Sequence, residues 1–231
     1  MTDVVLLAHG SPDPRHADDL GALESAVRAR VGGGVRLAFL DHHGPTIAEA
    51  AAALREGGPG PVVVVPILLT RAYHARVDAP TAVADLAEAS GREVLLAPAL
   101  GPHPLLGTAV GELLGVPAPG RILLHLAGSA RDTAVTELIA VLRDSLPAGA
   151  SSAVATLDER WPLAAAVDRL GGPDGVVAVG VVIAGGVLRD RMAQRCEAVG
   201  IPMVAGVLAR TAALADLVLL RARESLSAPR S

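Results

Sequence analysis

The chain has 231 residues, of which 51% are hydrophobic and 1% aromatic, and its formal net charge is −4. This length allows two domains of ordinary size, and the negative charge and scarcity of aromatic rings argue against a nucleic-acid partner. The single cysteine, Cys196, excludes an internal disulfide framework and suits a reducing cytoplasm, where we expect the protein to be found.

Buried strands alternate with helices in the first half of the chain. Short runs that are apolar on both faces predict parallel strands at 4–7, 35–40, 62–69 and 94–96. Segments rich in Ala and Leu at helical spacing predict helices at 17–31, 47–55, 81–89 and 104–114. This alternation is typical of an open, doubly wound α/β sheet. The longest uncharged stretch, 94–111, is interrupted by three prolines, so we expect no membrane-spanning helix.

The same order of elements repeats in the second half. Strands are predicted at 122–126, 152–156, 176–183 and 202–204, and helices at 132–146, 163–170, 190–199 and 211–223. The sequence Leu-Ala-His-Gly-Ser at 7–11 is matched by His-Leu-Ala-Gly-Ser at 125–129. We therefore expect an internal duplication, with domains at 1–116 and 121–231 joined by a linker at 117–120.

The two halves differ in their histidines, because all seven occur by residue 125. The repeat aligns His9 with Ala127 and places His74 near Leu188. This asymmetry predicts that the chemistry stayed in the first half, with one strong metal site per chain. His125 lies two positions before Ala127 and is expected to have no partner ligands.

Three polar residues follow three neighbouring strands of the first half. His9 follows the first strand, Asp41 the second, and His74 lies a few residues past the third. If the strand order is 2-1-3-4, all three project into the crevice beyond the carboxyl ends of the strands. Two imidazoles and one carboxylate with open coordination positions suit a divalent metal such as Co²⁺, Fe²⁺ or Ni²⁺.

Neighbouring residues are candidates for binding a substrate. Ser11 can cap the following segment or donate a hydrogen bond to a ligand. Arg71 and Arg76 flank His74 and could pair with substrate carboxylates, although a salt bridge from Arg76 to the nearby Asp78 is the alternative. His43 belongs to a histidine pair after the second strand, of which at least one member is expected to face solvent.

Four segments resemble one known family. The run Leu-Leu-Ala-His-Gly-Ser at 6–11 resembles the opening of the sirohydrochlorin chelatases, the cobalt- and iron-inserting branch of the class II tetrapyrrole chelatases. Residues 39–41 with Pro45, the run 66–69 leading to 73–78, and residues 100–104 are similar to further signatures of that family. Four such segments in order make the resemblance specific in the first half, whereas the second half matches in architecture only.

The resemblance implies two flavodoxin-like halves facing each other across a cleft for the macrocycle. It also implies metal insertion without an organic cofactor, with His9 and His74 as metal ligands and proton acceptors. Two positions depart from the family pattern: Asp41 stands where glutamate is frequent, and Pro12 stands where arginine is frequent, with Arg15 following later.

The expected activity is insertion of Co²⁺ or Fe²⁺ into sirohydrochlorin, in cobalamin or sirohaem biosynthesis, by a monomeric lyase whose partner is this acidic tetrapyrrole. Insertion releases two pyrrole protons, which histidine can accept near neutral pH. One alternative is a metal or tetrapyrrole carrier without turnover, and another is an iron-dependent oxygenase. A ferrochelatase acting on protoporphyrin is disfavoured, because its site lies in the C-terminal half, which here has no histidine after position 125.

Overall fold

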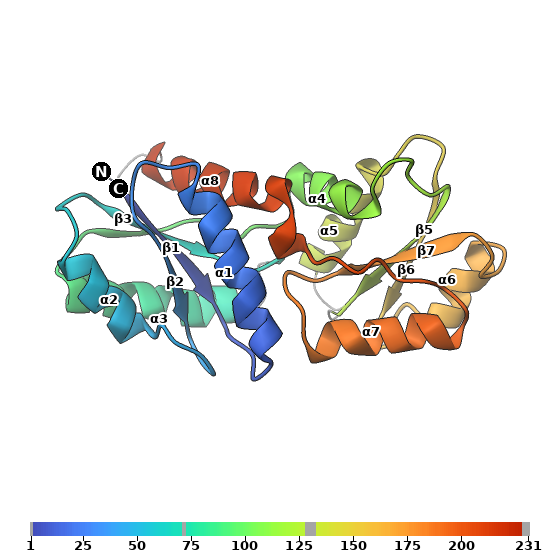
Figure 1. Ribbon diagram of the computed structural model, residues 1–231, viewed down its shortest axis with the longest axis horizontal. Helices are drawn as coiled ribbons and strands as arrows, with labels where there is room; N and C mark the ends of the chain where they lie inside the picture. The colour runs from blue at the N-terminus through green and yellow to red at the C-terminus, as the bar shows by residue number, and fades with distance from the viewer. Residues whose placement is uncertain (1, 71–72, 128–132, 228–231) are drawn as a thin grey trace. The chain divides into compact units, whose positions relative to one another are not determined.

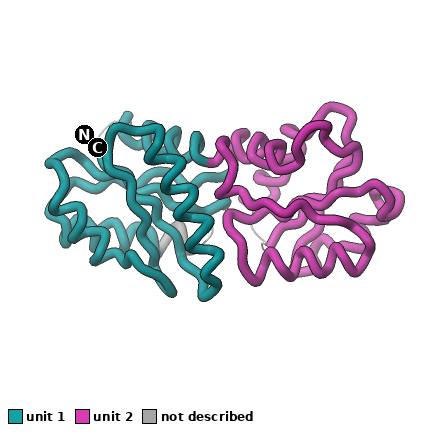
Figure 2. The backbone as a smooth tube through the Cα atoms, viewed as in Figure 1, with its two compact units in different colours: residues 1–101, 215–231 teal, residues 102–214 magenta. Residues whose placement is uncertain are grey.

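The computed structural model describes residues 2–70, 73–127 and 133–227, with the backbone alone for residues 73–77. It contains two compact units, which are coloured separately in Figure 2: unit 1 is Met1–Gly101 with Ala215–Ser231, and unit 2 is Pro102–Leu214. These units do not follow the division expected at residues 117–120. Helix α4 (Pro104–Leu114) groups with unit 2, and most of helix α8 (Ala212–Ser227) groups with unit 1.

Unit 1 is built on a four-stranded parallel sheet in the expected order β2-β1-β3-β4. Strands β1, β2 and β3 are labelled in Figure 1. The strands are β1 (Asp3–Ala8), β2 (Val35–Phe39), β3 (Val62–Pro66) and β4 (Val94–Leu96). Every residue of β1 and β3 is buried, as expected for strands that are covered by helices on both faces.

Three helices of unit 1 connect these strands: α1 (Pro14–Arg28), α2 (Ile47–Arg55) and α3 (Tyr73–Ser90). Helices α2 and α3 pack together with Val5 and Leu7 of β1 in one hydrophobic cluster. Helix α2 begins at a capping box, in which the Thr46 hydroxyl and the Glu49 carboxylate satisfy each other's backbone N–H groups. The sheet edge where the strands end is therefore framed by α2 and α3.

Helix α3 begins eight residues before the expected start at residue 81, so that expectation was wrong. Pro80 lies inside the helix, where its missing N–H would ordinarily favour a break. The buried residues Ala79, Ala82 and Leu86 continue one apolar face across Pro80, and this packing keeps the helix continuous. His74 consequently lies in the first turn of a helix rather than at a strand end.

Unit 2 contains a three-stranded parallel sheet in the order β6-β5-β7. Its strands are β5 (Arg121–Leu126), β6 (Ser151–Thr156) and β7 (Val176–Val181), and its remaining helices are α5 (Thr133–Asp144), α6 (Leu163–Arg169), α7 (Val187–Ala198) and the 3-10 helix η1 (Leu208–Arg210). The strand expected at 202–204 is absent from the described structure. Met203 forms only an isolated bridge with Ala178, and the preceding Pro202 has no N–H to extend a ladder.

The backbone of the two units supports an internal duplication. Strand register pairs Ala8 with Phe39 in unit 1 and Leu126 with Thr156 in unit 2, which makes Asp41 and Asp158 equivalent, each two residues past its strand pair. The next residues, His42 and Glu159, have positive φ angles of 66° and 60°, and they are the two described non-glycine residues with this conformation. The same unusual turn therefore follows the second strand of each unit.

None of the helices in the described parts of the chain is both long enough and apolar enough to cross a membrane.

Candidate functional site

The loops after β1 and β2 are joined beyond the end of the sheet ladder. The Leu40 N–H donates to the Ala8 carbonyl at 3.0 Å, and the Asp41 N–H donates to the His9 carbonyl at 2.8 Å. Backbone hydrogen bonding between the two segments thus continues past the ends of the strands. It brings His9 and Asp41 to the same edge of the sheet, as the sequence predicted.

Gly10 allows the close approach of these two loops. Its φ angle is +99°, and a Cβ atom at this position would lie 1.9 Å from the carbonyl oxygen of Asp41. A residue with a side chain would meet both backbone strain and a direct clash here. The glycine after His9 is therefore required by the geometry that holds Asp41 beside it.

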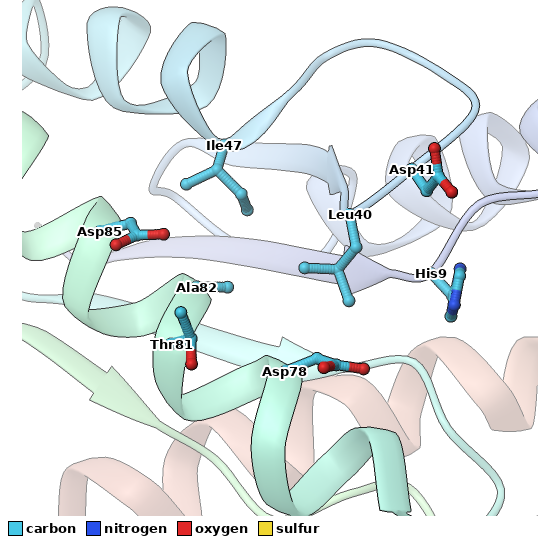
Figure 3. Close-up of a pocket in the computed structure, with 8 residues that line it drawn as sticks. All are labelled: His9, Leu40, Asp41, Ile47, Asp78, Thr81, Ala82 and Asp85. Carbon is cyan, nitrogen blue, oxygen red and sulfur yellow. The ribbon is translucent and has the colours of Figure 1, made fainter.

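A pocket of about 420 Å³ opens at this edge of unit 1. Figure 3 shows His9 and Asp41 at the strand ends and Asp78, Thr81 and Asp85 on helix α3. Leu40, Ile47 and Ala82 complete the lining. Three carboxylates beside one imidazole make the pocket electronegative, which favours a cation over an anion.

The contribution of α3 was missed in the sequence. From the sequence, Asp78 is a candidate only for a salt bridge with Arg76, and Thr81 and Asp85 are not candidates for the site. The signal was present, because positions 78, 81, 82 and 85 follow the spacing of one helical face. A helix that begins at residue 81 leaves Asp78 outside this face.

The Asp41 carboxylate is accessible and held by its own loop. Its side chain is 63% exposed. One oxygen, Oδ1, accepts a hydrogen bond from the His42 N–H at 2.7 Å, and Oδ2 lies 3.6 Å from His42 Nε2. His9 is also exposed. Both side chains can therefore be reached by an ion or a ligand from solvent.

His74 is the second residue of α3 and precedes Asp78 by four residues, which is about one helical turn. Its side chain and that of Arg76 lie outside the described residues, as does the whole of Arg71. Within the described part of the chain, no three side chains among His, Cys, Asp and Glu are grouped to hold a metal. Ligation by His9, Asp41 and His74 together thus stays a prediction.

Ser11 takes part in the turn that leads into α1. Its Oγ accepts a hydrogen bond from the Asp13 N–H at 3.2 Å, and Asp13 is the N-cap residue of α1. The Asp13 carboxylate in turn binds the Arg15 guanidinium at 2.6 Å, and this hydrogen-bonded pair lowers the pKa of Asp13. Ser11 and Arg15 therefore have local structural partners.

His43 lies beside Asp41 but faces a neighbouring pocket of about 560 Å³. Its ring meets the Phe39 ring edge-on, with centroids 5.7 Å apart, and its buried Nε2 has no hydrogen-bond partner. The His16 ring also lies near the Phe39 ring, with centroids 6.4 Å apart. Burial, and to a smaller extent the charge of His43, lowers the pKa of His16. His43 thus lines an adjoining pocket, which shares Leu40, Asp41 and Ile47 with the pocket that His9 lines.

The corresponding positions of unit 2 keep the carboxylate and lose both histidines. Ala127 follows β5 as His9 follows β1, and Leu188 is the second residue of α7 as His74 is of α3. Asp158 accepts hydrogen bonds from the Thr156 hydroxyl at 2.6 Å and from the Arg160 N–H at 3.3 Å. The retained carboxylate therefore stabilises its own turn.

His125 has a neighbour on helix α7, although its lack of partner ligands for a divalent metal stays a prediction. Its Nδ1 lies 3.5 Å from the sulfur of Cys196 on α7, and both residues are 0% exposed. Burial, with a smaller effect of Arg195, lowers the pKa of His125 to about 4, and burial raises the pKa of Cys196 to about 11. Near neutral pH, the pair is an uncharged imidazole beside a thiol.

Known proteins resemble this chain in sequence and in fold. A family model described as CbiX matches residues 3–115. A sirohydrochlorin cobaltochelatase of Saccharolobus islandicus is 34% identical over 80 residues, which are 35% of this chain. The match covers 62% of that relative, so it spans less than two thirds of the relative's own length.

Solved structures match the fold over nearly the whole chain. SirB from Bacillus subtilis with Fe³⁺ has a TM-score of 0.78 at 22% identity, covering 98% of this chain and 96% of that one. The sirohydrochlorin chelatase SirB from Bacillus subtilis subspecies spizizenii in complex with cobalt has a TM-score of 0.77 at 19% identity, covering 97% and 94%. The resemblance seen in the sequence is confirmed: residues 3–115 match the CbiX family, and the α/β fold with two parallel sheets is that of the SirB structures.

Proposed function

We propose that this protein inserts a divalent metal, Co²⁺ or Fe²⁺, into sirohydrochlorin and that unit 1 carries the chemistry. The observation that supports this most directly is the 2.8 Å hydrogen bond from the Asp41 N–H to the His9 carbonyl, which holds an imidazole and a carboxylate at one pocket. The curated relative is named a sirohydrochlorin cobaltochelatase, and the SirB structures are described with Fe³⁺ and with cobalt.

The metal approaches the pocket as a substrate. The carboxylates of Asp41, Asp78 and Asp85 attract a divalent cation, and His9 offers a nitrogen donor that suits Co²⁺ and Fe²⁺. Asp41 ligates the ion or orients it. The acidic groups of the macrocycle are repelled by the same carboxylates, so they bind elsewhere, with Ser11, His43, Arg71 and Arg76 as candidates.

Insertion exchanges one divalent ion for two protons. The two pyrrole N–H protons leave the ring as the metal loses water and binds the ring nitrogens, so the reaction needs neither an electron nor an organic cofactor. An imidazole that is not bound to metal accepts a proton at neutral pH. His9 and His74 share the tasks of metal ligand and proton acceptor.

A multiple-turnover assay distinguishes an enzyme from a carrier. Catalytic amounts of protein are mixed with excess sirohydrochlorin and Co²⁺, and product is followed by visible absorption. An enzyme forms many equivalents of product per chain, faster than the spontaneous reaction. A carrier of metal or tetrapyrrole gives no rate above the spontaneous one, and this result would reject the proposal.

Matched variants locate the chemistry in unit 1. His74→Ala is expected to reduce insertion to the spontaneous rate, with an unchanged circular dichroism spectrum. Leu188→Ala alters the equivalent position of unit 2 and is expected to keep insertion within about twofold of the unmodified protein, because an exposed leucine contributes little to the fold. Near-normal turnover in His74→Ala would show that the proposed site is wrong.

A further inference from the structure

The sulfur-containing side chains that follow Met1 all belong to unit 2, whereas His9 and His74 of the proposed chelatase site belong to unit 1. The chain has one cysteine, Cys196, and two methionines besides Met1, which are Met192 and Met203. All three contact the same small region of the β5–β7 sheet, where His125 is buried. The chelatase reaction proposed for unit 1 uses none of these four residues.

Strand register and helix spacing bring these residues to one face. His125 pairs in register with Gly180 of β7, so both face the same side of the parallel sheet. Helix α7 covers that side, and Met192 and Cys196 lie four residues apart on its buried face. The Cys196 sulfur lies 3.5 Å from His125 Nδ1.

Gly180 leaves room for two thioether sulfurs beside the histidine. A Cβ atom at Gly180 would lie 3.4 Å from the sulfur of Met203 and 3.6 Å from the sulfur of Met192. The bridge between Ala178 and Met203 turns the Met203 side chain to the face that Cys196 covers, where it packs on the same hydrophobic cluster. Met203 is partly exposed, whereas the other three donors are fully buried, so Met203 forms the entry side.

The histidine has an unused polar atom. His125 is 0% exposed, and its Nε2 has no hydrogen-bond partner. Most buried polar side-chain atoms in proteins have a partner, because leaving one unpaired is destabilising. The other ring nitrogen of His125, Nδ1, faces the Cys196 sulfur, and the sulfurs of Met192 and Met203 lie against Gly180, its partner in register, so one imidazole and three sulfurs are gathered on one face of the sheet.

We propose that His125, Cys196, Met192 and Met203 form a binding site for one Cu⁺ ion in unit 2. Thiolate and thioether donors select soft ions such as Cu⁺ over the borderline ions that suit the unit 1 pocket. With metal–nitrogen and metal–sulfur bonds of about 2.0 and 2.3 Å, the nitrogen and sulfur ligands of a tetrahedral site lie about 3.5 Å apart. The Nδ1 atom of His125 and the sulfur of Cys196 have this separation. The Cys196 thiol loses its proton to solvent as its sulfur binds Cu⁺, and no electron is transferred.

Anaerobic titration with Cu⁺ as its coloured bicinchoninate complex tests the site in the full-length chain. The protein is expected to withdraw one Cu⁺ per chain. Cys196→Ser and His125→Leu are expected to lose this binding, and Met192→Leu and Met203→Leu, which keep side-chain volume, are expected to weaken it by at least about tenfold. His9→Ala serves as the control for unit 1 and is expected to bind Cu⁺ normally.

Circular dichroism and urea unfolding of each variant separate loss of copper from loss of fold, and the two leucine variants retain the buried volume of the methionines. The proposal is overturned if the unmodified chain leaves all copper on bicinchoninate, or if Cys196→Ser withdraws as much as the unmodified chain. It is also overturned if both leucine variants bind with unchanged affinity, since a thiol alone would then account for the copper. Loss of copper binding in His9→Ala would also overturn it, because the copper site would then lie in unit 1.

Discussion

Substitution of Gly10 by alanine tests the junction that brings His9 and Asp41 together. A Cβ atom there would lie 1.9 Å from the Asp41 carbonyl oxygen, so the loops must separate by about 1.5 Å to reach an ordinary contact of 3.4 Å. That movement breaks the 2.8 Å hydrogen bond between Asp41 and His9, at a cost of about 1 kcal/mol. The left-handed backbone adds about 1–2 kcal/mol.

Gly91→Ala is the matched control in the same unit. Gly91 also has a positive φ, +68°, but a Cβ atom there meets nothing within 4 Å. We expect urea unfolding to show a loss of about 1–2 kcal/mol for Gly91→Ala, and a further loss of about 1 kcal/mol, to about 2–3 kcal/mol, for Gly10→Ala. Cobalt insertion should be normal in the control and at least about 100-fold slower in Gly10→Ala, since a displacement near 1 Å is that costly to catalysis. Equal stability and equal rates in the two variants would refute this reasoning.

Other predictions concern separate parts of the fold. The pKa of His125 is about 4 when folded and near 6.5 when unfolded, so the unfolded chain takes up the proton first as pH falls. Stability should decrease by about 3 kcal/mol between pH 6.5 and 4, and urea unfolding at several pH values should show this decrease shrinking in His125→Leu. Asp3→Asn should lower the free energy of unfolding by about 3 kcal/mol in the same assay without slowing insertion. The buried Arg92 guanidinium, which lies 2.6 Å from the Asp3 carboxylate, would lose its counter-charge. An unchanged urea midpoint would contradict this. Asp41→Ala should slow insertion less than His74→Ala, and complete loss of activity would instead identify Asp41 as a primary ligand.

The sheet of unit 1 could be predicted because its strands are apolar on both faces and are separated by helices of regular spacing. Once the order 2-1-3-4 was assumed, the meeting of His9 and Asp41 followed, since the carboxyl ends of parallel strands share one edge. Placing Asp78, Thr81 and Asp85 in the pocket requires knowing where α3 begins. The start of α3 is decided by the packing of residues on both sides of Pro80, and a local sequence pattern does not reveal this packing.

Contacts between distant segments account for the other differences. Residues 202–204 have the composition of a strand, yet they make a single bridge because Pro202 cannot donate. The partner of His125 is 71 residues away along the chain, on a helix whose rotation is set by packing. The sequence shows that His125 is two positions away from Ala127, which aligns with His9, but it does not show that Cys196 packs against His125.

The initial rate of Co²⁺ insertion into sirohydrochlorin by His9→Ala, compared with the unmodified chain under multiple turnover, tests the central claim most directly. His9 is exposed at the end of β1, so its replacement should leave the fold and urea midpoint unchanged. We predict a rate above the spontaneous reaction for the unmodified chain and a rate equal to the spontaneous reaction for His9→Ala. Equal rates for the two proteins would contradict the assignment of metal insertion to unit 1.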